Sequence, residues 1–154
     1  MAHLALAVLG PVAVTRDGQP ITAFATGKVR ALLAYLAVEA GRPHRREALA
    51  ELFWPAQPPQ VARTSLRQAL ATLRQALGDT DAVPRFLLIA RETVQFNRTS
   101  DHALDVDAFT ALLAACEHHA HDCLETCTPC AHRLVGRVTP WGGSLRWLAR
   151  PEGR

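Results

Sequence analysis

Lysine is almost absent from this chain of 154 residues. Of its 17 basic side chains, all but Lys28 are arginines. Arginine suits phosphate groups and guanine edges, but a GC-rich genome explains the same excess more simply. The bias alone therefore identifies no ligand.

Long apolar runs are also missing. No stretch approaches the roughly 20 apolar residues that a membrane-spanning helix needs, so we expect no membrane partner. The first apolar stretch has no Lys or Arg before it and is cut off by Gly10 and Pro11, which argues against a signal peptide. We therefore expect a cytoplasmic protein.

The motifs of common enzymes are absent too. The chain contains no G-x-S-x-G, no G-x-x-x-x-G-K-[ST] and no H-E-x-x-H. The acidic stretch from Asp101 to Asp107 is more simply read as the solvated start of a helix, where negative charge favours the N-terminus. We expect no enzymatic activity.

Charge is unevenly distributed behind the formal net charge of +3. Residues 1–78 hold nine basic and four acidic side chains, residues 79–132 hold three and nine, and residues 133–154 hold five and one. The basic front half predicts a polyanionic partner. With 49% hydrophobic residues the chain is too apolar for intrinsic disorder, and its length suits one domain with an appendage.

The order of apolar patterns predicts an α+β fold. Three short strands are expected first, at residues 4–9, 12–15 and 19–24, with a hairpin turn at Asp17 and Gly18. A hairpin turn at this place makes the strands on its two sides antiparallel.

Three helices, a hairpin and a fourth helix are expected after the sheet. Their predicted ranges are 27–40, 45–53, 60–77, 86–96 and 105–115. The second helix is expected to turn four residues inward, namely Ala48, Leu49, Leu52 and Phe53. A tight, non-helical loop is expected at residues 55–59, because it holds three prolines.

The third predicted helix carries two distinct faces. Four leucines form one stripe about 60° wide, and three arginines occupy a neighbouring sector; these residues are Leu66, Leu70, Leu73 and Leu77, then Arg63, Arg67 and Arg74. No acidic residue occurs between Glu51 and Asp79. Arg can fork onto guanine, Gln onto adenine, and small residues such as Ala69 and Ala71 let a helix sit deep in a groove. An ordinary solvated helix face fits the same pattern.

The neighbouring elements favour DNA. Two helices joined by a short turn and followed by a hairpin make a helix-turn-helix with a wing, and Arg91 lies at the tip of that hairpin. Trp54 could donate its indole N–H to a phosphate, although filling the core is an equal alternative.

Several stretches of the chain resemble the SARP-type bacterial transcriptional activators. The resemblance is carried by LAVLGPVAVTRDG from Leu6, KVRALLAYLA from Lys28, REALAELFWP from Arg46 and ARTSLRQALATLRQALG from Ala62. It runs through residues 4–78 without a large gap and extends more loosely to about residue 115.

This resemblance implies an OmpR-like winged helix over residues 1–100, with an N-terminal antiparallel sheet, three helices and a C-terminal hairpin. Part of a helical activator domain is implied over residues 101–154. In the family the third helix enters the major groove of promoter direct repeats. Position by position, Arg63, Thr64, Arg67 and Gln68 fall where that helix meets DNA, and Arg74 and Arg91 fall at backbone contacts. The implied partners are double-stranded DNA, RNA polymerase and a second copy bound on the repeats.

All four cysteines lie between Cys116 and His132, together with four of the seven histidines. Cys116-x2-His119 and Cys127-x2-Cys130 supply two ligand pairs at zinc-like spacing, so a structural zinc ion is one interpretation. Free thiols are a second, because cytosolic cysteines stay reduced, and a redox pair is a third.

The segment from residue 133 onward departs from the family pattern. Gly136 and Pro140 interrupt the helix expected there. We expect a fragment of a longer regulator, or a frame-shifted one, rather than a stand-alone DNA-binding protein. The main prediction is a promoter-binding regulator, and the alternative is a protein-interaction module whose third helix packs on polymerase or a regulatory partner.

Overall fold

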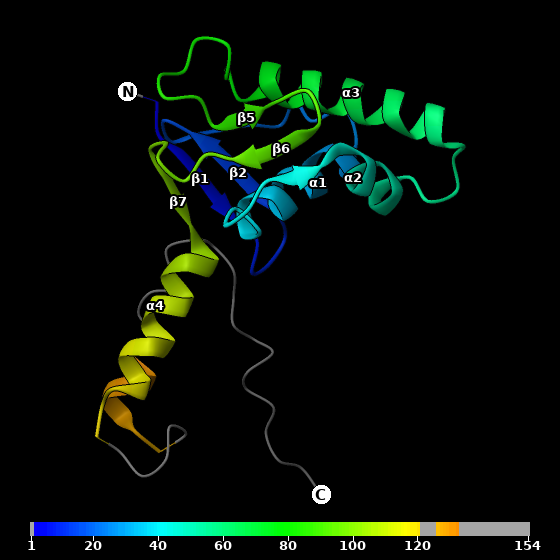
Figure 1. Cartoon of the computed structure of the whole chain (residues 1–154). Coiled ribbons are helices and arrows are strands. Elements are labelled where there is room, and N and C mark those ends of the chain that lie inside the picture. Colours follow the sequence, from blue (N-terminus) through cyan, green and yellow to red (C-terminus); the bar gives the residue numbers. More distant parts are fainter. Residues whose placement is uncertain (1, 121–125, 133–154) are drawn as a thin grey trace, which may run out of the picture.

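A computed structural model describes residues 2–120 and 126–132. Within these residues, two small sheets lie around three helices, and a fourth helix extends from one side (Figure 1). The expected irregular tail at 133–154 lies outside the described residues, as do His121 and Cys123.

The first sheet begins at the N-terminus. Strands β1 (Leu4–Ala7), β2 (Ala13–Arg16) and β3 (Gln19–Pro20) pair in antiparallel fashion, as predicted. Asp17 and Gly18 both have positive φ, at 52° and 78°, which suits the two-residue turn between β2 and β3. The sequence did not predict β7 (His102–Leu104), which lies parallel to β1 at the sheet's other edge.

The three helices follow the predicted order. They are α1 (Gly27–Val38), α2 (Arg46–Phe53) and α3 (Pro59–Ala76). Thr26 caps α1, because its hydroxyl oxygen accepts a hydrogen bond from the Val29 N–H at 3.4 Å. Helix α3 starts at Pro59 rather than after it; proline is tolerated there because the first helical N–H needs no partner.

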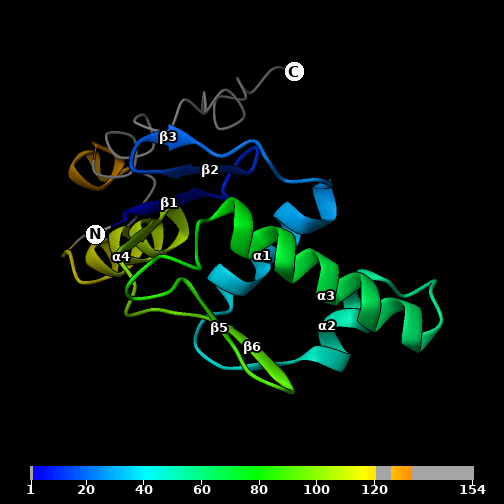
Figure 2. The same ribbon diagram turned by 90° about the horizontal axis from the view of Figure 1, so that it is seen from above.

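The core lies between α1, α3 and the sheets. The leucine stripe predicted for α3 is confirmed, since Leu66, Leu70, Leu73 and Leu77 are at most 3% exposed. Leu32, Leu33 and Leu36 of α1 are fully buried in the same cluster. Figure 2 shows α3 running across α1 and past α2. Burial of this stripe fixes which side of α3 is left to solvent.

Two predictions about which residues face the core and which face outward are wrong. Helix α2 buries Leu49 and Ala50, whereas Ala48 is exposed and Leu52 is 54% exposed. Ala69 is only 4% exposed and belongs to the core, so it does not help α3 sit in a groove. In both helices the packing partners, which a single helix pattern does not contain, decide the boundary of the buried face.

The second sheet contains the hairpin. Strands β5 (Leu87–Ile89) and β6 (Thr93–Phe96) pair antiparallel, and β4 (His44–Arg45) adds a short edge against β6. The buried Asp79 holds the entry to the hairpin, because its Oδ1 accepts the N–H groups of Phe86 and Leu87. The wing therefore has a fixed position relative to the C-terminal end of α3.

Helix α4 (Asp105–Glu117) follows β7 and runs away from the three helices (Figure 1). It is two residues longer than predicted. Its first turn is attached to β1 through Asp105, whose Oδ2 accepts the N–H groups of Val8 and Leu9 at 2.8 and 3.0 Å. Phe109, Leu112 and Leu113 are half-buried. Within the described part of the chain, no helix is both long and apolar enough to cross a membrane.

Candidate nucleic-acid interface

The exposed side of α3 carries four of the predicted site residues. Arg63, Thr64, Arg67 and Gln68 are all exposed, while the leucines of the same helix lie in the core. The Thr64 hydroxyl donates to the Gln60 carbonyl at 3.1 Å, one turn earlier. Helix α3 thus presents guanidinium, amide and methyl groups on a rigid, anchored frame.

A cleft of about 550 Å³ lies beside this face. Its walls come from the start of α2, the first half of α3 and the turn of the hairpin. The lining includes five arginines and two glutamates, namely Arg45, Arg46, Arg63, Arg67, Arg91, Glu47 and Glu92. We call this cleft, with its five arginines, the arginine cleft. Three elements that are distant in sequence therefore contribute positive charge to one surface.

One of the arginines is held by a carboxylate from α2. The Nη2 of Arg63 lies 2.6 Å from Oε1 of Glu47, and both side chains are about half exposed, at 49% and 56%. An ion pair this exposed contributes only about 0–1 kcal/mol to stability. It can exchange for a phosphate at little cost, and until then it limits the orientations of Arg63.

Sequence reasoning missed Arg45 and Arg46 as site residues. They precede and begin α2, which brings them to the mouth of the cleft. The Nε of Arg46 is buried and has no hydrogen-bond partner among the described residues. Two consecutive arginines at a predicted helix start were the available signal, because a helix N-terminus favours anions.

The other predicted site residues lie in different surroundings. Arg91 lies in the cleft wall, at the turn between β5 and β6. Arg74 is half-buried in the last turn of α3 and does not line the cleft. Trp54 is 9% exposed and belongs to the core, with the Lys28 Nζ 5.7 Å from its ring centroid. The structure thus describes a packing role for Trp54, and its phosphate contact stays a prediction.

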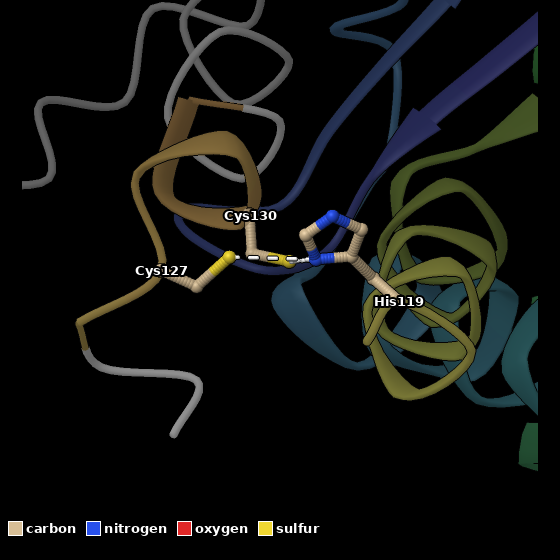
Figure 3. Close-up of side chains that lie close together, drawn as sticks. All are labelled: His119, Cys127 and Cys130. Carbon is tan, nitrogen blue, oxygen red and sulfur yellow. Dashed lines mark hydrogen bonds between the residues drawn. The ribbon is translucent and has the colours of Figure 1, made fainter. Parts of the chain in front are cut away.

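The predicted histidine–cysteine cluster is assembled at the far end of α4. The ligand atoms of His119, Cys127 and Cys130 all lie within 4.8 Å of one another (Figure 3). Cys116 is 1% exposed and joins Cys127 and Cys130 in a small buried cluster. Burial, followed by hydrogen bonds with the side chains of Cys116 and Cys127, raises the pKa of Cys130 to about 12.

A winged helix with a basic cleft between its third helix and its wing defines a class, the DNA-binding transcriptional regulators. Residues 19–93 match the family described as "Transcriptional regulatory protein, C terminal", and this part of the chain is a winged-helix domain of that family. The resemblance to SARP-type activators is confirmed by relatives of the same kind.

Two of these relatives are the transcriptional regulatory proteins EmbR of Mycobacterium bovis and of Mycobacterium tuberculosis H37Rv. Each is 34% identical over 118 residues, a stretch that covers 77% of this chain and 30% of the relative. A solved structure of Mycobacterium tuberculosis EmbR, in complex with a low-affinity phosphopeptide, is similar with a TM-score of 0.65 and 32% identity. The similar region covers 31% of the EmbR chain in that structure and 77% of this chain. The chain thus spans less than a third of the length of these relatives.

Proposed function

We propose that this protein binds promoter DNA sequence-specifically by placing α3 in the major groove. The observation that carries the proposal is the arginine cleft, in which α2, α3 and the wing turn their positive charge to one face. A major groove about 12 Å wide admits one α-helix, and the flanking elements then meet the phosphates on either side.

The exposed residues divide into two roles in this complex. Arg67 and Gln68 reach base edges from the middle of the exposed face, with Arg63 and Thr64 one turn earlier. Arg45, Arg46 and Arg91 contact phosphates, because they lie on the flanking elements. Arg74 contacts the backbone at the other end of the helix.

The larger assembly is part of the same proposal. Residues 1–100 form the DNA-binding unit, and residues 101–154 contribute the beginning of a helical activator domain. Two copies bind neighbouring direct repeats and contact RNA polymerase. Such a regulator works in the cytoplasm, where its promoter is.

We further propose that the histidine–cysteine cluster holds zinc in a structural role. Nitrogen and thiolate sulfur are the donors that zinc prefers, and three of them already converge. This ion would support the segment that follows the DNA-binding unit and would take no part in base recognition.

DNase I footprinting of the full chain on its own upstream region tests the DNA-binding proposal. We expect a protected stretch at protein concentrations that leave a shuffled fragment of equal composition unprotected, because specific sites bind roughly 10³–10⁷ times more tightly than non-specific DNA.

Methylation of guanine N7 then tests the groove, since this atom lies in the major groove. We expect interference at guanines inside the footprint. Equal binding to both fragments would overturn the assignment as a promoter reader. A footprint that N7 methylation leaves unchanged would overturn the placement of α3.

A further inference from the structure

The distances within the histidine–cysteine cluster match those around a metal ion. The Nδ1 of His119 lies 3.5 Å from the Sγ of Cys127 and 3.6 Å from the Sγ of Cys130 (Figure 3). In a tetrahedral site, Zn–S bonds of about 2.3 Å and Zn–N bonds of about 2.0–2.1 Å place sulfur and nitrogen about 3.5–3.6 Å apart. Both nitrogen–sulfur distances therefore have the length expected for a zinc tetrahedron, and the two sulfur atoms lie within 4.8 Å of each other.

Hydrogen bonding alone explains this arrangement poorly. One ring nitrogen of a histidine offers either a single N–H or a single lone pair, and here it faces two sulfur atoms at nearly equal distance. A cation at the centre would accept electron pairs from all three atoms at once.

Cys116 is the donor best placed to complete the set among the described residues. It lies in the last turn of α4, and its carbonyl accepts a hydrogen bond from the His119 N–H at 3.1 Å, which holds the two residues in one turn. It is 1% exposed and packs with Cys127 and Cys130 in one small buried cluster. Its sulfur lies outside the 4.8 Å group, so its side chain must turn toward the ion.

We propose that Cys116 is the fourth ligand of a Cys₃His zinc site that joins the last turn of α4 to the segment at 126–132. The inference rests on the zinc role proposed above and goes further in two respects: it argues from the geometry for the ligand set that the spacing suggested, and it says which segments the site connects. Four protein ligands leave no open position for water, so the site is structural and not catalytic. The connection spans two segments that the chain joins only through residues 121–125.

Metal analysis of four forms of the full chain tests the ligand set. The forms are the parent, Cys116→Ser, Cys130→Ser and Cys123→Ser, the last being the matched control because Cys123 is the remaining cysteine. Each is purified without chelator, its zinc content is measured, and its affinity is determined by competition with a chromophoric chelator.

We expect one zinc per chain in the parent and in Cys123→Ser, and none in Cys130→Ser. Cys116→Ser should bind zinc at least tenfold more weakly. With cobalt as a probe, its sulfur-to-metal charge-transfer band should be weaker than in the parent, in proportion to the thiolate lost. The thermal unfolding of the winged helix, followed by far-ultraviolet circular dichroism, should be unchanged, which separates loss of a ligand from loss of the fold.

Each of the remaining outcomes contradicts one named part of the proposal. A parent without zinc overturns both the zinc role and this inference, and leaves DNA binding untouched. Full zinc affinity in Cys116→Ser overturns Cys116 as a ligand while the zinc role stands. Loss of zinc in Cys123→Ser together with retention in Cys116→Ser assigns the fourth position to Cys123.

Discussion

Arg67 differs from Arg63, one turn earlier in α3, in its ion pairing. Arg63 is paired with Glu47, whereas Arg67 is exposed and has no ion pair among the described residues. A guanidinium without an internal partner can form a bidentate contact with guanine O6 and N7 and breaks no existing interaction. Arg67 is therefore the residue at which base recognition is best tested.

Replacing Arg67 with Ala should weaken specific binding by roughly 1–3 kcal/mol and relax the preference at one base pair. The measurement is a titration of labelled promoter DNA and of single-base variants. Arg42→Ala is the matched control, because Arg42 is exposed outside the cleft and its guanidinium lies 3.9 Å from the Glu39 carboxylate. Unchanged binding by Arg67→Ala would remove Arg67 from the interface.

Gly78 ends α3 in a conformation that side chains rarely adopt, with φ of +58°. An added Cβ would also lie 1.6 Å from Nη1 of Arg16, the group that donates to the Leu77 carbonyl at 3.0 Å. Gly78→Ala should therefore lower the free energy of unfolding by roughly 1–2 kcal/mol.

Urea unfolding measures the effect of Gly78→Ala. Gly41→Ala is the control, because Gly41 has no positive φ and open space around it. Equal stabilities of the two variants would show that the end of α3 has no such requirement.

Single residues were predictable where one force decides. The leucine stripe of α3 was predicted correctly because burial recurs at helical spacing over 18 residues. In α2, which has only eight residues, two overlapping stripes were compatible with the sequence, and contact with α3 chose Leu49 and Ala50 over Leu52. Arg46 was missed because it becomes a site residue only when α2 packs beside α3 and the wing in the folded protein.

At the scale of elements, α4 depends on its first turn for attachment to the sheet. Asp105 accepts the N–H groups of the two residues that follow β1, and hydrogen bonds to a charged group contribute about 1.5–3 kcal/mol each at most. Asp107 lies in the same turn but only pairs with Arg98, at 3.2 Å, on the surface. The two aspartates share the helix-dipole effect and differ in tertiary contacts.

Asp105→Ala should therefore destabilise the protein by roughly 1–3 kcal/mol, and Asp107→Ala by under about 1 kcal/mol. Amide hydrogen exchange locates the effect: protection should fall at Val8 and Leu9 in the first variant only. Equal losses in both variants would mean that helix-dipole charge, and not the link to β1, holds α4.

The short strands β4 and β7 could not be predicted from the sequence. Strand β7 has three residues and pairs in parallel with β1 almost a hundred positions earlier, and β4 has two. Segments this short show no alternation, and their pairing comes from tertiary contact. The hairpin of β5 and β6 was predicted because its turn and both its strands are local.

At the scale of the whole molecule, the net charge of +3 understates the field that a polyanion meets. The arginine cleft concentrates five guanidinium groups, while most of the acidic residues occur after position 78 in the chain. The predicted split between a basic first half and an acidic segment thus corresponds to a charged face on the folded surface. Steering by such a face depends on ionic strength.

The salt dependence of binding measures how many phosphates the cleft engages. If the three phosphate-contacting arginines of the cleft and Arg74 each replace a counterion, the logarithm of the association constant should fall with the logarithm of salt concentration with a slope of roughly −4. Arg91→Ala should make this slope shallower by about one unit on every sequence, since a phosphate contact carries no base preference. Arg98→Ala, outside the cleft, should leave the slope unchanged. A slope near zero, with tight binding to a protein partner instead, would favour the interaction-module alternative, because packing of α3 on a protein releases few counterions.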